Sequence, residues 1–281
     1  MKKKNKTKEK EIKYEKKLSI IVPCYKVEKY LPRCLDSLVN QTLDGVEAIC
    51  INDGSPDNCL KILKALPKES IDLIVNDPPY RVTNRGKTGL GGIFKTAQTQ
   101  GLQAKLFKHN NINVSDYAKL FYNILKEGTV CYVMTNSFNI KTMLVEFEKV
   151  GFKFITIICW NKKNKITTPY YMQQCEYILM FRKGTYKRIN NCSQSNLISI
   201  SNIANKTHGH PTEKPVDLMK IFVEQSSKEG DIVLDPFVGV GATAIACKET
   251  NRKFIGCELD KKYFKTTLKR LKENRYKSIF T

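Results

Sequence analysis

The sequence has few of the features that mark secreted, membrane or zinc-binding proteins. Its ten cysteines form no C-x-x-C pair and have no histidine partner at a metal-binding spacing. This pattern predicts reduced thiols, as in cytosolic proteins, and argues against a disulfide framework or a zinc site. No apolar run is long enough to cross a membrane, and the lysine-rich N-terminus precedes no apolar signal-type segment. We therefore expect a soluble cytoplasmic protein without a metal ion or a membrane partner.

Acidic residues are also scarce relative to basic ones. The chain has 27 Asp and Glu against 48 Lys and Arg, which gives a formal net charge of +21. Clustered Lys and Arg release counterions when they meet phosphates, so this excess indicates a polyanionic partner. A lysine-rich, A·T-rich genome would raise the lysine content in the same way, and charge alone does not establish a nucleic-acid site.

The length and the apolar content are sufficient for a sizeable core. A chain of 281 residues with 41% apolar residues fits one large domain, or one domain with an appended piece. Residues 1–17 are mostly Lys, Glu and Asn and show no periodicity. We expect this segment to be a basic, disordered tail.

Two turns with unusual composition each follow an apolar, strand-like run. Residues 71–76 precede the segment Asp77–Tyr80 (D-P-P-Y), and residues 231–234 precede Asp235–Thr243, which contains two glycines in a tight turn. Open α/β sheets bind ligands at the carboxyl ends of their strands, so both turns can face one crevice. The first offers a carboxylate, two prolines and an aromatic ring, and the second lets the backbone approach a small ligand.

From residue 57 onward, predicted strands and helices alternate, as in an α/β fold with a doubly wound, mostly parallel sheet. The expected helices cover residues 60–66, 114–125, 140–150, 216–226, 242–249 and 261–274. The expected strands cover residues 71–76, 128–135, 154–160, 177–181, 232–235 and 254–258.

Together, the two turns resemble those of the β class of DNA amino-methyltransferases, in which the target-amine motif precedes the motif for S-adenosylmethionine (SAM). The resemblance covers residues 57–281. It implies a Rossmann-like methyltransferase fold, SAM as the cofactor and double-stranded DNA as the partner. It also allows a cognate restriction endonuclease as a further partner, and either a monomer or a homodimer.

The resemblance assigns the chemistry to the first turn. In the family, the Asp side chain and the carbonyl of the first proline accept the N–H groups of the target amine, and the aromatic ring stacks on a flipped base. The catalytic positions implied here are Asp77, Pro78, Pro79 and Tyr80. The D-P-P-Y form favours adenine N6 over cytosine N4. The alternative explanation is a Pro-Pro turn that simply ends a strand.

The resemblance also implies a SAM site. Lys214, in the segment H-P-T-E-K-P, is expected to meet the methionine carboxylate, and Glu258 the ribose hydroxyls. Thr243 opens a helix whose N-terminus favours negative ligand groups. Asp57 would face the adenine amine of SAM, or instead cap the following helix. The cofactor-binding positions are Asp57, Lys214, Asp235, Phe237, Gly239, Gly241, Thr243 and Glu258.

Residues 18–56 carry a different pattern. They read as strand, helix, strand, and their I-I-V-P-C-Y and N-D-G-S segments resemble the opening of family 2 glycosyltransferases. Nothing after them supplies the D-x-D carboxylates that those enzymes need, so we interpret residues 18–56 as a truncated fragment. We place the fusion within residues 54–64 and expect the strand at 47–52 to replace the one that normally precedes the helix at 60–66.

Two rival functions remain at this point. The fusion could have produced an inactive protein that binds DNA or SAM, or residues 18–56 could still bind a nucleotide-sugar near Asp53. Of the loops, residues 81–109 are expected to act as a DNA clamp, and residues 183–209 occupy the place where the family reads sequence. Trp160 is expected in the core, and Glu176 as a structural partner.

Overall fold

The computed structural model describes residues 18–24, 30–40, 46–52, 60–79, 112–167, 170–185, 188–203 and 208–277. Five expectations fall outside these ranges: the tail at residues 1–17, the clamp at residues 81–109, and the positions Asp53, Asp57 and Tyr80.

The described segments alternate between strands and helices. The strands are β1 (Leu18–Cys24), β2 (Val46–Asn52), β3 (Ile71–Asn76), β4 (Leu125–Thr135), β5 (Lys153–Ile166), β6 (Gln173–Arg182), β7 (Leu197–Ser199), β8 (Ile232–Asp235) and β9 (Lys253–Glu258). The helices are α1 (Leu31–Val39), α2 (Leu60–Ala65), α4 (Val114–Ile124), α5 (Ile140–Lys149), α6 (Val216–Ser226), α7 (Ala242–Glu249) and α8 (Lys261–Lys277).

All the strands belong to one nine-stranded sheet with the order β1-β2-β9-β8-β3-β4-β6-β5-β7. The strands from β1 to β4 in this order are parallel to one another. β6 is antiparallel to both β4 and β5, and the short β7 is parallel to β5. The expected mostly parallel α/β sheet is therefore confirmed.

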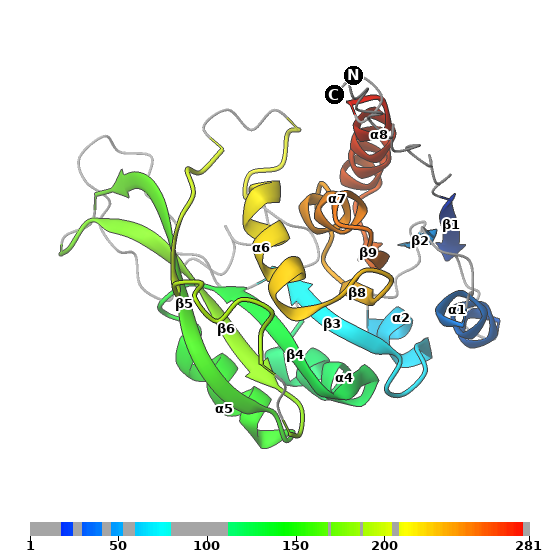
Figure 1. The fold of residues 1–281 in the computed structure, drawn as a ribbon, viewed down its shortest axis with the longest axis horizontal. Helices are drawn as coiled ribbons and strands as arrows, with labels where there is room; N and C mark the ends of the chain where they lie inside the picture. Colours follow the sequence, from blue (N-terminus) through cyan, green and yellow to red (C-terminus); the bar gives the residue numbers. More distant parts are fainter. Residues whose placement is uncertain are drawn as a thin grey trace, which may run out of the picture.

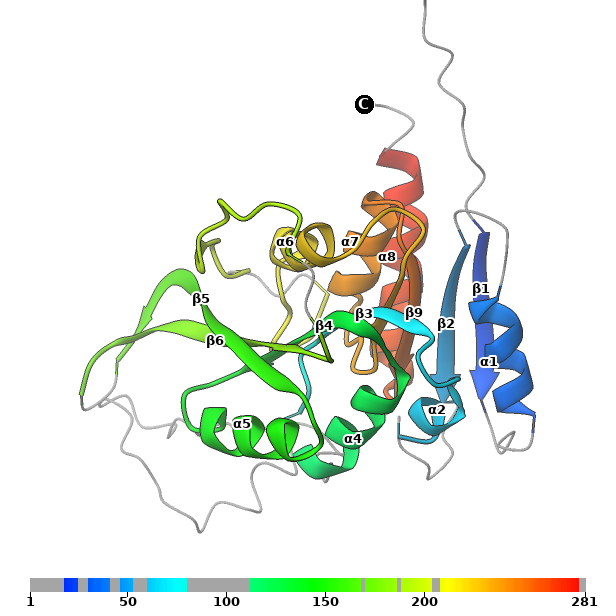
Figure 2. The same cartoon turned by 60° about the horizontal axis from the view of Figure 1, so that its bottom comes forward.

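Helices cover both faces of the sheet. Figures 1 and 2 show α4 and α5 on one side and α6, α7 and α8 on the other. Neighbouring residues of β3 supply both layers: Ile74 belongs to the core cluster on the α4 side, whereas Leu73 and Val75 belong to the cluster on the α6 side. Because both faces are buried, β3 is apolar at Ile71 and at residues 73–75, as strands in parallel sheets usually are.

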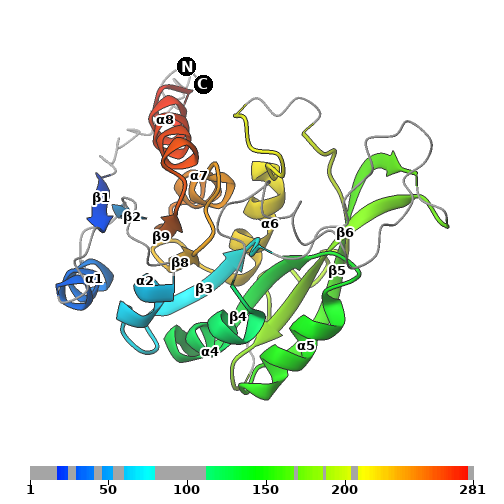
Figure 3. The same ribbon diagram turned by 180° about the vertical axis from the view of Figure 1, so that it is seen from behind.

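The N-terminal strand–helix–strand unit is part of this sheet. β1 and β2 are parallel, and β2 pairs with β9 through partners such as Ile51 and Glu258. Figure 3 shows this unit at the edge of the molecule, beyond β9. Leu35 of α1 is fully buried and shares a core cluster with Leu63 of α2. The strand over residues 47–52 thus lies directly beside β9, and its replacement of the strand that normally precedes α2 stays a prediction.

The hairpin of β5 and β6 is longer than the sequence predicted. The expected strands covered residues 154–160 and 177–181, whereas the observed strands extend to Ile166 and start at Gln173. The polar run after Trp160 lacks the apolar alternation that signals a strand, and its pairing with β6 holds it extended. Among the described residues, no helix has both the length and the apolar character needed to span a bilayer.

Candidate functional site

Three neighbouring parallel strands end at one edge of the sheet. β3 pairs with β8, and β8 pairs with β9, all in parallel. Asp77 follows the end of β3, Asp235 is the last residue of β8, and Glu258 is the last residue of β9. The two turns identified in the sequence therefore lie at the carboxyl ends of adjacent strands, where α/β sheets bind their ligands.

The turn after β3 is anchored from below. Asn76 is fully buried, and its side-chain amide donates a hydrogen bond of 2.9 Å to the carbonyl of Tyr132 on β4. Pro78 is buried, whereas Asp77 and Pro79 are half-buried. The prolines fix the backbone that follows, because their rings restrict φ. The Asp77 carboxylate therefore projects from a rigid turn at the sheet edge.

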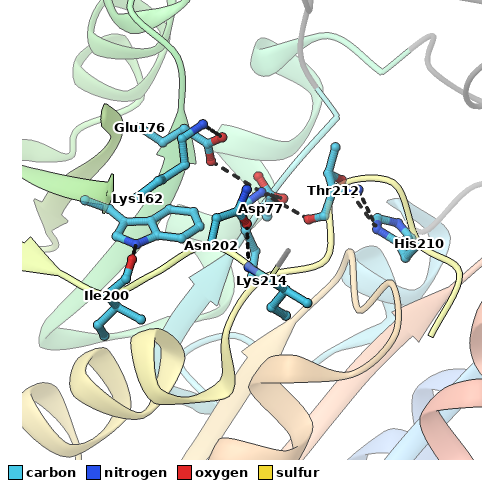
Figure 4. Close-up of polar contacts among 10 residues, drawn as sticks. Asp77, Lys162, Glu176, Ile200, Asn202, His210, Thr212 and Lys214 are labelled. Atoms are coloured by element: carbon cyan, nitrogen blue, oxygen red, sulfur yellow. Dashed lines mark hydrogen bonds and ion pairs between the residues drawn. The ribbon is translucent and has the colours of Figure 1, made fainter. Parts of the chain in front are cut away.

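Lys214 is the principal partner of Asp77. Its Nζ lies 2.5 Å from Asp77 Oδ2 and 3.6 Å from Glu176 Oε2, and its side chain is 7% exposed (Figure 4). The sequence predicted that Lys214 binds the methionine carboxylate of a cofactor. The structure instead places its ammonium group between two carboxylates of the protein, and a cofactor contact stays a prediction.

Glu176 and Lys162 extend this set of charges. Lys162 Nζ lies 2.9 Å from Glu176 Oε1, in the hairpin of β5 and β6 (Figure 4). Burial would raise the pKa of Glu176, but the ammonium groups of Lys214 and Lys162 outweigh it and hold that pKa below its ordinary value. Trp160, as expected, is a core residue, and its indole N–H donates to the Ile200 carbonyl.

The turn after β8 requires its glycines. Gly239 and Gly241 have φ values of +55° and +86°, in the left-handed region that glycine adopts without strain. A Cβ atom on Gly241 would lie 2.6 Å from Cγ2 of Thr267, so a larger residue would also collide with α8. The turn thus places backbone without side chains at the carboxyl ends of the strands, where a small ligand could contact it closely.

Asp235 and Thr243 shape this turn from beneath. Both are almost completely buried; the Thr243 hydroxyl donates to Asp235 Oδ2 at 2.6 Å, and the Phe237 N–H donates to Oδ1 at 3.0 Å. Burial raises the pKa of Asp235 to about 7 in spite of these hydrogen bonds. The two residues hold the turn in place, and direct contact of either one with a cofactor stays a prediction.

Glu258 and Phe237 flank the glycine turn. Glu258 Oε2 accepts the Gly239 N–H at 2.7 Å, and Oε1 accepts the Asp260 N–H at 2.8 Å. Desolvation raises the pKa of Glu258 to about 7 in spite of these bonds. The ring of Phe237 packs edge-on against Tyr117 at a centroid distance of 5.8 Å. Glu258 thus stands at the end of the next strand, as the sequence predicted.

The segment before α6 is held by residues to which the sequence assigned no individual role. Glu213 Oε1 lies 2.6 Å from His208 Nδ1 and 3.4 Å from Arg270 Nη1, which also donates to the carbonyl of Val240. The ring of His210 packs against Tyr263 of α8. Arg270 lies far along the chain in a lysine-rich helix, so only the folded structure reveals that it joins this segment to the glycine turn.

The geometry supports transfer between two adjacent ligands. A carboxylate on a rigid turn can accept N–H bonds from a polar group, and the neighbouring backbone cradle can hold a second molecule close to it. Within the described ranges, no group of three or more His, Cys, Asp or Glu side chains is arranged to hold a metal ion.

Two family models match the sequence. The model described as "DNA methylase" matches residues 71–269, and the model for glycosyl transferase family 2 matches residues 19–100. The two matches overlap, and the second includes the N-terminal unit built on β1, α1 and β2.

Curated relatives agree with the first match. The type II methyltransferase M2.DpnII of Streptococcus pneumoniae is 30% identical over 230 residues, which cover 75% of this chain and 86% of the relative. The DNA adenine methyltransferase YhdJ of Escherichia coli is 27% identical over 249 residues, which cover 76% of this chain and 80% of the relative.

Solved structures share the fold. The M1.HpyAVI–SAM complex superposes with a TM-score of 0.58 at 24% identity, and the alignment covers 79% of this chain and 99% of that one. The cytosine-N4-specific PvuII DNA methyltransferase gives a TM-score of 0.61 at 20% identity, with 81% and 86% covered.

Proposed function

Because the chain belongs to the DNA methylase family, we propose that it transfers the methyl group of SAM to an exocyclic amine of a flipped base in double-stranded DNA, with adenine N6 as the favoured target. The observation that carries this proposal is the adjacency of two turns. The Asp77 turn and the Gly239 turn follow strands β3 and β8, which are hydrogen-bonded neighbours.

The glycine turn has the properties that a SAM site needs. Its backbone is left-handed at two glycines, and a Cβ atom on Gly239 would lie 3.4 Å from Nε2 of His210. The Glu258 carboxylate stands at the end of the adjacent strand. A carboxylate in that place suits two ribose hydroxyls, and the N-terminus of α7 suits a negative group. When bound, SAM supplies an electrophilic methyl group and leaves as a neutral thioether.

Residues of the chain direct the amine toward that methyl group. An exocyclic amine is a weak nucleophile because its lone pair is delocalised into the ring. Asp77 and the Pro78 carbonyl accept its N–H bonds, which favours pyramidal geometry at nitrogen and aligns it for in-line attack. Methyl transfer would replace one N–H proton of the amine, and the Asp77 carboxylate, which is hydrogen-bonded to that amine, would accept the proton and pass it to solvent. Tyr80 is proposed to stack on the flipped base.

The preference for adenine rests on the motif and on relatives. The turn carries Asp77, as in the D-P-P-Y form that favours adenine, and YhdJ is named a DNA adenine methyltransferase. The PvuII structure, which shares the fold, is named cytosine-N4-specific. Both amines can approach a carboxylate with the same geometry, so the base must be identified by experiment.

The decisive experiment for the target base uses DNA from a host without its own methylases. The DNA is incubated with the protein and SAM, digested to nucleosides and separated by mass spectrometry. We expect N6-methyladenine. N4-methylcytosine would replace the adenine assignment, and neither product from protein that binds SAM would overturn the proposed function.

We also propose how the N-terminal part fits this function. Residues 18–56 act as a truncated glycosyltransferase-like unit that completes the sheet of a methyltransferase domain at 57–281, because β2 pairs with β9 of that domain. The rival activity, sugar transfer, is favoured only by the family match over residues 19–100. Calorimetric titration with nucleoside diphosphate sugars tests this rival activity. Measurable binding would support sugar transfer, and the absence of binding would reject it.

The type II relatives raise the question of a partner enzyme. M2.DpnII is named a type II methyltransferase, the class of methyltransferases that accompany restriction endonucleases. We propose a cognate restriction endonuclease as a functional partner in the same cell. Expression of the chain should then protect DNA from cleavage at one sequence.

A further inference from the structure

We propose that Lys162 and Glu176 are positioning residues for methyl transfer, which act on Asp77 through Lys214. This inference rests on the proposed function. It concerns four alternating charges, here called the charge row: Lys162, Glu176, Lys214 and Asp77.

The contacts of the charge row form an unbroken series. Lys162 Nζ lies 2.9 Å from Glu176 Oε1, Lys214 Nζ lies 3.6 Å from Glu176 Oε2, and the same Nζ lies 2.5 Å from Asp77 Oδ2. Figure 4 shows these side chains converging from the hairpin, from the segment before α6 and from the turn after β3. A displacement at one end can therefore reach the Asp77 carboxylate through direct contacts alone.

The hairpin fixes the outer half of the row. Glu176 pairs directly with Trp160 across β5 and β6, so the two side chains lie on the same face, and Lys162 follows two residues later on that strand. The carbonyl of Lys162 accepts the N–H of Asn202, and the ring of Trp160 is bound to the carbonyl of Ile200. The buried Trp160 thus anchors the backbone that carries both charges.

Burial makes each charge depend on its neighbour. The side chains of Lys162 and Lys214 are 9% and 7% exposed, and those of Glu176 and Asp77 are 24% and 20% exposed. An ammonium group this deeply buried is costly unless it is paired, so removing the charge of Glu176 leaves two buried cations without the anion between them. Lys214 would then lose its attraction to Glu176 and keep the contact with Asp77.

The arrangement gives Lys214 a second acceptor. Glu176 Oε2 is buried and has no hydrogen-bond partner among the described residues, and it stands only 3.6 Å from Lys214 Nζ. A small shift of the ammonium group would convert this contact into a hydrogen bond. The Glu176 carboxylate can therefore accept a hydrogen bond from the Lys214 ammonium group when the target amine binds Asp77. The ion pair with Lys162 holds Glu176 in place.

Single-turnover methylation at saturating SAM and DNA tests this inference, with the SAM dissociation constant and the thermal midpoint measured on each variant. Glu176→Gln keeps the shape and removes the charge, and we expect the rate constant to fall about 10–100-fold. Lys162→Met should lower it about 3–10-fold. SAM affinity should change less than about threefold in both.

The double variant supplies a readout that a purely structural role would not produce. Because Lys162 acts through Glu176, Glu176→Gln/Lys162→Met should be no slower than Glu176→Gln alone, within about twofold. Lys162→Arg, which keeps a cation, should recover most of the rate. The matched control is Lys126→Met, which removes a 2.7 Å ion pair with Asp72 at the other end of β3 and should leave the rate unchanged.

Three outcomes would overturn the inference. One is a normal rate per folded molecule in Glu176→Gln and Lys162→Met with only a lower thermal midpoint. The second is a pair of losses that simply multiply in the double variant. The third is a loss confined to SAM affinity. Absence of methylation by the parent protein would instead reject the proposed function, so the two failures are distinguishable.

Discussion

The three carboxylates at the site have different electrostatic surroundings. Asp77 is paired with the ammonium group of Lys214, whereas Asp235 and Glu258 are held by neutral donors: a hydroxyl and backbone N–H groups. Burial raises the pKa of both Asp235 and Glu258 to about 7. Charge at the glycine turn is therefore sensitive to pH near neutrality.

Substitution of Asp77 separates the two halves of the site. Asp77→Ala should leave SAM binding nearly intact, because the proposed SAM site consists of the glycine turn and Glu258. It should lower methyl transfer by about 10²–10³, the usual effect of losing one preorganised polar contact in a transition state. Calorimetry gives the first quantity and single-turnover methylation the second. Near-parental turnover would refute the assignment of Asp77.

The raised pKa of Glu258 predicts how stability depends on pH. The ordinary value is 4.5 and the folded value is about 7, so between these values the folded state binds more protons than the unfolded state. The contribution of Glu258 to stability is thus fully present below about 4.5 and is lost as the pH rises through about 7. Thermal midpoints from pH 5 to 8 should fall less steeply in Glu258→Gln than in the parent chain. Parallel curves would contradict the raised pKa.

At the residue scale, the sequence located the turns but not all of their partners. The glycines and the D-P-P-Y segment are local patterns, so Asp77, Gly239 and Glu258 could be placed at strand ends before the fold was known. The contacts of Lys214 depend on the register of the hairpin, which pairs Trp160 with Glu176. No local pattern encodes that register, and for this reason Lys162 was not identified.

At the element scale, α1 and β2 connect the N-terminal unit to the rest of the molecule. β2 pairs with β9, and Leu31 and Leu35 of α1 are buried in the core cluster that contains Ile62 and Leu63 of α2. This contact covers apolar surface that the helices would otherwise expose, so the unit contributes to the stability of the domain.

Substitution in α1 tests this contribution. Leu35→Ala removes a fully buried side chain and should lower the free energy of unfolding by about 2–5 kcal/mol. Cys34→Ala, at an exposed position of the same helix, is the matched control and should change it by less than about 0.5 kcal/mol. Chemical denaturation followed by circular dichroism measures both. Equal free energies of unfolding for Leu35→Ala and the parent chain would show that the packing of α1 does not contribute to the stability of the domain.

The elements also show where sequence patterns reach their limit. β3, β8 and β9 are short, apolar and buried, and their bounds were predicted almost to the residue. The outer parts of β5 and β6 are polar, and only their mutual pairing makes them strands. Pairing between distant residues is a tertiary effect, which periodicity within one segment does not report.

At the scale of the whole molecule, one sheet contains strands from both regions that the two family models match. The parallel order β1-β2-β9-β8-β3-β4 runs from the glycosyltransferase-like unit into the methyltransferase without interruption. The alternation of strands and helices was sufficient to predict this layered fold. The formal charge of +21 agrees with a polyanionic partner such as DNA, although charge alone could not identify it.

The central claim is that this chain moves a methyl group from SAM to DNA. The most direct test incubates the full-length protein with methyl-labelled SAM and unmethylated duplex DNA, and then measures label in the purified DNA. We predict incorporation that saturates at a fixed number of sites per molecule of DNA and is lost in Asp77→Ala. A protein that binds SAM and DNA but leaves the DNA unlabelled would contradict the account.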